Sequence, residues 1–125
     1  MAHWLSSSIG LPYEAGGQGP HAFNCWGFVR WALEQHYGFT VPLLPVLETP
    51  SQWQRVDCPQ EGDVMVLSHS CVSCHVGLWV DVDGGGLAHC LKGAGVVFQN
   101  SLALSLLSCS AQRFYRFKAT TCLQQ

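Results

Sequence analysis

The feature that most constrains the fold is one helix pattern between an irregular loop and a series of short strand patterns. Residues 9–24 are rich in glycine and proline and predict a loop. Residues 25–37 carry apolar side chains at helical spacing, with Asn24 as an N-cap and Gly38 as a C-terminal stop. One N-terminal helix followed by antiparallel hairpins predicts an α+β fold.

The remainder of the chain reads as strands and turns. Pro42, Pro45 and Pro50 predict that residues 39–60 are a connecting segment, and a glycine-rich stretch at 83–86 predicts a hairpin turn. Residues 101–109 fit neither a helix nor a strand clearly. The runs predicted as strands are residues 64–67, 75–82, 87–91, 95–98 and 113–117.

Length and composition narrow the class of protein. The chain has 125 residues, 48% of them apolar and 11% charged, which predicts a single globular domain over residues 1–125. A net charge of -2 without a cluster of basic residues argues against a nucleic-acid partner. The sequence contains no run of 18 apolar residues, so no membrane span is predicted. The first residues lack the pattern of an export signal, so we expect synthesis in the cytoplasm without a signal peptide.

Cys25 stands where the loop becomes the helix. Backbone N–H groups at a helix N-terminus carry partial positive charge, so a thiol there ionises more readily than a free one. The competing interpretation is a buried structural cysteine. The position at the start of the helix favours a nucleophile, because this end of a helix is electropositive and normally accessible.

Two histidines lie on the predicted hairpin. His75 opens the first strand and His89 lies near the end of the second, so pairing about the turn makes them approximate cross-strand neighbours. His75 is the candidate base for Cys25, and a hydrogen bond from His89 would fix its tautomer and orientation. His3, His21, His36 and His69 are expected on the surface or in loops, and Asp63 is expected to serve turn geometry.

The cysteine pattern leaves other interpretations. Residues 71–75 match the haem-attachment pattern C-x-x-C-H, which would require export and would leave Cys25 unexplained. A zinc site formed by His69, Cys71, Cys74 and His75 is a second alternative, but neighbouring residues on a strand point to opposite faces. Seven irregularly spaced cysteines are more consistent with reduced thiols than with a disulfide framework. We therefore expect no metal and no cofactor.

Taken together, these motifs resemble those of the NlpC-type cell-wall cysteine peptidases, a papain-like family of bacteria and phages. The resemblance covers residues 9–117. Within the family, the sequence is most similar to members associated with phage or prophage tails. The residues that carry it are Tyr13, Gly16-Gly17, Asn24-Cys25-Trp26-Gly27-Phe28-Val29, Gly62-Asp63-Val64, His75-Val76-Gly77 and His89.

The resemblance implies a papain-like fold in which the helix with the nucleophile packs on an antiparallel sheet. It assigns Cys25 as the nucleophile, His75 as general base and acid, and His89 as the orienting residue. Tyr13 would bind the oxyanion together with the Cys25 N–H. Cys25 is expected as a thiolate paired with protonated His75. The implied substrate is the peptidoglycan stem peptide, cut between D-glutamate and diaminopimelate. Phage tail proteins are candidate partners, and the virion tail or the periplasm is the candidate destination.

Two departures from the family pattern bear on function. Asn24 replaces the usual aspartate, which keeps the N-cap and removes a negative charge near the thiol. Residues 70–74 are inserted just before His75 and would either reshape the cleft or add sensitivity to redox state or metals. Two further functions are consistent with the motifs: an amidase or acyl transferase effector with another substrate, and a non-catalytic module that binds peptidoglycan or tail proteins.

Overall fold

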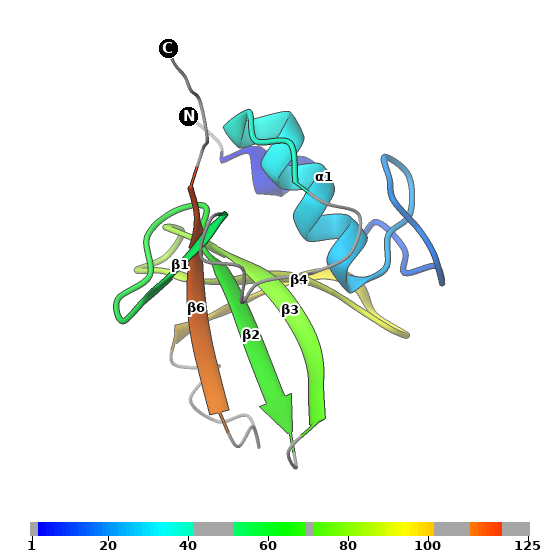
Figure 1. Ribbon diagram of the computed structural model, residues 1–125. Helices are drawn as coiled ribbons and strands as arrows, with labels where there is room; N and C mark the ends of the chain where they lie inside the picture. The colour runs from blue at the N-terminus through cyan, green and yellow to red at the C-terminus, as the bar shows by residue number, and fades with distance from the viewer. Residues whose placement is uncertain (1–2, 42–51, 70–71, 102–110, 119–125) are drawn as a thin grey trace.

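A computed structural model describes residues 3–41, 52–69, 72–101 and 111–118 of the chain. One helix lies against a twisted antiparallel sheet (Figure 1), which confirms the α+β fold. Within the described residues the strands form a single sheet in the order β1-β6-β2-β3-β4-β5. The elements are the 3-10 helix η1 (Trp4–Ser7), α1 (Cys25–Tyr37), β1 (Trp53–Val56), β2 (Val64–His69), β3 (Val72–Val80), β4 (Gly86–Leu91), β5 (Gly95–Asn100) and β6 (Ala111–Phe117).

The helix begins and ends where the sequence predicts. The side-chain oxygen of Asn24 accepts a hydrogen bond from Gly27 N–H at 2.6 Å, which satisfies one free donor of the first turn. Gly38 ends the helix with a left-handed φ of 74°, a conformation that side chains with a Cβ rarely adopt. Local signals at both ends therefore fix the position of Cys25 as the first helical residue.

The five predicted strands are all present, several of them longer than expected, but the interpretation of residues 39–60 as a connection was wrong in part. Strand β1 lies inside this segment and pairs with β6, Trp53 opposite Phe117. The rings of these two residues lie 4.9 Å apart at their centroids, and Trp53 is buried. The strand is only four residues long, and its partner lies far along the chain, so no local pattern reveals it. The unassigned segment 101–109 lies outside the described residues apart from Ser101.

The core occupies the face of the sheet that meets α1. Val29 and Leu33 of the helix pack against residues of β2 and β3, while Phe28 packs near β4 and β5. The strand residues in these two clusters alternate along each strand, for example Val76 and Leu78 on β3. His75 and His89 occupy the intervening positions, together with a smaller apolar cluster formed by Met65, Leu67 and Leu87.

Strands β3 and β4 pair over a short distance only. The recorded pairs join Leu78, Trp79 and Val80 to Ala88, Leu87 and Gly86. Beyond these pairs, β3 stays paired with β2, whereas β4 diverges from β3 and lies close to the end of α1 that carries Cys25 (Figure 1). The two histidines lie on the strands where they separate. No helix in the described part of the chain is long and apolar enough to cross a membrane.

Three polar residues have more partners than the sequence indicates. Asp63 accepts a hydrogen bond from Gln60 N–H in the turn, as expected, but it is buried and also forms a two-pronged ion pair with Arg116. His3 lies 2.8 Å from a carboxylate oxygen of Glu61, and His36 stacks on Trp4 with ring centroids 4.3 Å apart. His36 is exposed and His3 lies in an irregular segment, as expected for surface and loop residues, but both have partners that are distant in sequence.

Candidate active site

Cys25 is half-buried at the first position of α1. Its backbone N–H belongs to the first helical turn, where donors have no partner inside the helix. Among the residues that the structure describes, none accepts a hydrogen bond from this N–H. The thiol thus lies beside a free backbone donor at the positive end of the helix dipole.

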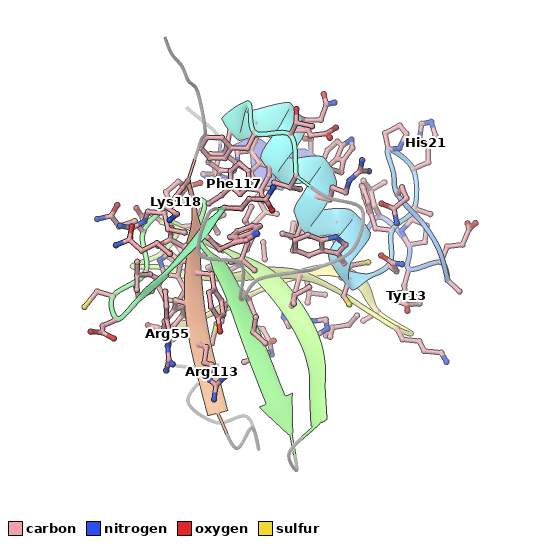
Figure 2. The ribbon with its side chains drawn as sticks, viewed as in Figure 1. Tyr13, His21, Arg55, Arg113, Phe117 and Lys118 are labelled. Carbon is pink, nitrogen blue, oxygen red and sulfur yellow. The ribbon has the colours of Figure 1, made fainter. Side chains whose placement is uncertain are left out.

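The carbonyl oxygen of Phe23 joins the start of α1 to two other parts of the fold. It accepts a hydrogen bond from Glu14 N–H at 2.9 Å, which holds the loop that carries Tyr13. It also accepts one from the Cys90 thiol of β4, at 3.4 Å. Tyr13 is half-buried and lies close to the beginning of the helix (Figure 2). Both the Tyr13 loop and the strand of His89 are therefore anchored two residues before Cys25.

A close backbone contact seats the loop on the helix. Asn24 N–H donates to the carbonyl of Gly17 at 2.9 Å. A Cβ added at Gly27 would lie 2.0 Å from the same carbonyl oxygen, closer than any real contact. Glycine is required at position 27 because the loop backbone occupies the space of a side chain.

The two histidines form a hydrogen-bonded chain with a third residue. Nε2 of His75 lies 2.7 Å from Nδ1 of His89, and Nε2 of His89 lies 2.7 Å from the side-chain oxygen of Gln99 on β5. His89 is 1% exposed. Sequence reasoning missed Gln99. The signal is in the register, because His89 pairs with Val97 and residue 99 is therefore its diagonal neighbour on the same face.

Glycine at position 77 makes room for this arrangement. If the pairing of β3 with β4 is extended by one residue, Gly77 faces His89. A Cβ at Gly77 would lie 2.9 Å from the Cβ of His89 and 2.6 Å from a side-chain atom of Leu87. The histidines therefore meet diagonally, with His89 seated over the glycine rather than directly opposite His75.

Burial controls the protonation of both rings. It lowers the pKa of His75 to about 4, assisted by the charge of His89. Burial also lowers the pKa of His89, although the hydrogen bond that His89 donates to the Gln99 oxygen opposes this. Both rings are accordingly neutral near pH 7, so the expected resting pair of thiolate and protonated His75 is disfavoured. In the described part of the chain, no hydrogen bond joins the Cys25 thiol to His75.

The described cysteines differ sharply in environment. Cys90 is fully buried, and burial together with the charge of Cys25 raises its pKa to about 11. Cys58 is exposed. Among these three described cysteines, only Cys25 combines partial exposure with a helix N-terminus. Cys71, and the side chains of His69 and Cys74 in the alternative zinc or haem sites, lie outside the described positions. The described residues contain no cluster of three metal-binding side chains.

The arrangement of a helix-start cysteine and a histidine pair on a sheet has a counterpart among known families. The model of the NlpC/P60 family matches residues 10–121, which is nearly the whole chain. The chain belongs to the NlpC/P60 family. Every residue placed above in the candidate site of this NlpC/P60 domain falls within the matched range. No curated protein sequence matches the chain.

Solved structures share the NlpC/P60 fold. The crystal structure of the NlpC/p60 domain of the peptidoglycan hydrolase SagA matches with a TM-score of 0.64 and 22% identity, covering 88% of this chain and 89% of that domain. A lipoprotein-like NLP/P60 protein from Staphylococcus aureus matches with a TM-score of 0.59 and 18% identity, covering 86% of this chain and 37% of that protein. At these identities the comparison establishes the fold alone.

Proposed function

We propose that this NlpC/P60 domain is a cysteine hydrolase that cleaves a peptide amide bond in bacterial peptidoglycan. The observation that carries the proposal is the position of Cys25: a half-buried thiol at a helix N-terminus, linked through the Phe23 carbonyl to the strand of His89. Membership of the family supports it, as does the neighbour named as a peptidoglycan hydrolase.

In the proposed mechanism, neutral His75 acts first as a base. Its Nε2 is engaged by His89, so Nδ1 is the nitrogen available to the Cys25 thiol. The thiol proton passes to Nδ1 as the sulfur attacks the scissile carbonyl carbon. His75 then returns the proton to the leaving nitrogen, the C–N bond breaks and a thioester remains on Cys25. Water, deprotonated by the same imidazole, hydrolyses the thioester and regenerates the thiol.

Two donors are proposed for the negative oxygen of the tetrahedral intermediate. The first is the backbone N–H of Cys25, which has no partner among the described residues. The second is the hydroxyl of Tyr13, on the loop anchored at the Phe23 carbonyl. Each such donor contributes about 3 kcal/mol to transition-state stabilisation. His89 takes no proton from the substrate and serves to orient His75.

The finer parts of the proposal concern the substrate and its place. We assign the bond between D-glutamate and diaminopimelate in the stem peptide, on the resemblance in the motifs around Cys25 and His75. A phage tail or a secretion machine is the proposed route to the cell wall, with tail proteins as partners in the first case.

Digestion of defined muropeptides tests the proposal directly. Purified protein is incubated with them and the products are identified by mass spectrometry. We expect cleavage by the wild type, none by Cys25→Ala, and undiminished cleavage by Cys58→Ala, which removes an exposed cysteine away from the site. Iodoacetamide should label Cys25 faster than Cys58.

Other outcomes assign other functions. Fast labelling of Cys25 without muropeptide cleavage would keep a cysteine hydrolase and reject the peptidoglycan substrate. Slow labelling together with absence of cleavage would reject catalysis and leave a binding module. Cleavage by Cys25→Ala at the wild-type rate would refute the assigned nucleophile.

A further inference from the structure

The hydrogen-bonded chain of His75, His89 and Gln99 has a direction, and this direction decides what His75 offers to Cys25. Both ring nitrogens of His89 are engaged, one by His75 and one by Gln99. A neutral imidazole carries one N–H donor and one bare acceptor nitrogen. The donor and acceptor of His89 must therefore be distributed between these two partners in one of two ways.

If Gln99 presents its side-chain oxygen to His89, the hydrogen bonds run from His75 through His89 to Gln99. The oxygen accepts from His89 Nε2–H, so His89 Nδ1 is bare and accepts from His75 Nε2–H. The remaining nitrogen of His75, Nδ1, then carries a lone pair. The structure has this arrangement, with the oxygen of Gln99 at 2.7 Å from Nε2 of His89.

If Gln99 presented its amide nitrogen, every bond would reverse. His89 would donate from Nδ1, His75 would accept at Nε2, and Nδ1 of His75 would carry a proton. A protonated Nδ1 on a neutral ring cannot accept the proton of a thiol. The orientation of the Gln99 amide therefore decides, through His89, whether Nδ1 of His75 can act as a base.

We propose that Gln99 is a positioning residue of the active site, whose side-chain oxygen fixes the tautomers of His89 and His75 so that Nδ1 of His75 is the bare base that the proposed mechanism requires. This inference rests on the proposed function for its catalytic consequence, but the tautomers themselves do not depend on any activity. Gln99 touches neither the substrate nor the sulfur in this scheme and acts through His89.

The burial of His89 makes the position of its acceptor decisive for its tautomer. His89 is 1% exposed, so water does not compete for its ring nitrogens. Loss of the acceptor would leave a buried N–H unpaired, which favours rearrangement of the proton to the other nitrogen. The glycine at position 77 seats His89 tightly, so the ring has little freedom to find another partner.

Nitrogen NMR of the histidine rings tests the tautomers. The Cys25→Ala protein is used at pH 7, where no thiol is present to share a proton with His75. Long-range proton–nitrogen spectra distinguish a protonated ring nitrogen from a bare one. We expect protonated Nε2 and bare Nδ1 on both His75 and His89. A protonated Nδ1 on either ring in this protein, in which Gln99 is intact, would overturn the proposal.

Two substitutions at Gln99 complete the test. Gln99→Met has similar length and no acceptor, and should change the His89 tautomer. Gln99→Glu offers oxygen acceptors only and should keep it. Unchanged tautomers in Gln99→Met, or altered ones in Gln99→Glu, would overturn the proposal. Gln54→Met, on an exposed position of β1, is the matched control and should leave both rings as they are.

Activity provides a second, separable readout with Cys25 present. Gln99→Met should lower kcat about tenfold with KM unchanged, and Gln99→Glu should restore most of it. If the wild type cleaves no muropeptide, the proposed function fails while the NMR result still decides the role of Gln99. If the wild type is active and Gln99→Met loses nothing, the positioning role fails and the hydrolase remains.

Discussion

At the scale of single residues, the pKa of His75 determines the pH range in which it is a base. The neutral ring is the active form, so activity is lost as pH falls through the pKa of His75. Because burial and the charge of His89 lower this pKa to about 4, we expect the acid limb of kcat/KM near pH 4 rather than near the ordinary 6.5. His89→Gln removes one cause and should move the limb upward. A limb near 6.5 in both proteins would contradict the assignment.

Substitutions at Asn24 distinguish the effect of helix capping on stability from the effect of charge on the Cys25 thiol. Asn24→Asp keeps the cap and should leave stability unchanged, but its carboxylate disfavours the thiolate and should slow alkylation of Cys25 at neutral pH. Asn24→Ala loses the hydrogen bond to Gly27 and should lower the free energy of unfolding by about 1 kcal/mol. Denaturant unfolding and timed iodoacetamide labelling measure the two effects. Faster labelling of Asn24→Asp would contradict the electrostatic argument.

Local motifs revealed some residues of the candidate site and not others. Cys25 follows a helix N-cap, and His75 and His89 flank a recognisable hairpin, so their placement depends on short-range patterns. Gln99 contributes through the register of β5 on β4, which the sequence does not state. The lowered pKa of His75 has no local sequence signal either, because burial depends on the packing of the whole site.

At the scale of elements, the ion pair between Asp63 and Arg116 holds β6 to the start of β2. Both bonds between the guanidinium and the carboxylate are 2.9 Å long, and the side chain of Asp63 is 2% exposed. The pair joins the last strand of the sheet in chain order to a turn some fifty residues earlier. Its loss would leave a charge in the interior.

Removal of one partner should therefore cost more than removal of both. Arg116→Met should lower the free energy of unfolding by about 2 kcal/mol, because Asp63 stays buried without its cation; the figure is below that of a fully buried pair, since the Arg116 side chain is 35% exposed and Asp63 keeps its bond from Gln60. The double variant Asp63→Asn with Arg116→Met should recover much of this loss. Chemical denaturation of the single and double variants measures the coupling. Additive losses would show that the pair contributes little beyond its individual side chains.

The position of each element's stabilising contacts along the sequence explains which elements were predictable. Helix α1 has an N-cap, an apolar stripe and a C-terminal glycine, all within residues 24–38, and its bounds were correct. Strand β1 was missed because the prolines around it dominate the local pattern, while its stabilising contacts with Phe117 are at the other end of the chain. Elements defined by local chemistry were found, and one defined by tertiary pairing was not.

At the scale of the whole molecule, Glu61 connects parts that are distant in sequence. One of its carboxylate oxygens accepts hydrogen bonds from the Tyr37 hydroxyl and from His3, and the other accepts from Asp81 N–H at 2.6 Å. Tyr37 in turn accepts from the Trp4 ring N–H at 3.0 Å. This network attaches the N-terminal segment to the end of α1 and to the end of β3, on the opposite end of the helix from Cys25.

The network makes stability depend on pH in a definite direction. Burial alone would raise the pKa of Glu61, but the hydrogen bonds from Asp81, Tyr37 and His3 outweigh it and hold the pKa below its usual value. A lowered pKa in the folded state contributes stability that is complete above pH 4.5, the ordinary value, and is lost as pH falls through the folded value. Tyr37 is affected in the opposite sense, since burial and the bond to Glu61 raise its pKa.

Glu61→Gln tests this connection. At pH 7 it should lower the free energy of unfolding by about 1 kcal/mol, a figure reduced for the partial exposure of the carboxylate. The difference from wild type should shrink as pH falls below 4.5, because the wild type loses the same interaction on protonation. Glu34→Gln is the matched control, since Glu34 makes only a 3.9 Å pair with Arg30, and it should change little at any pH. Parallel pH profiles for wild type and Glu61→Gln would mean that the charge of Glu61 does not hold the N-terminal segment in place.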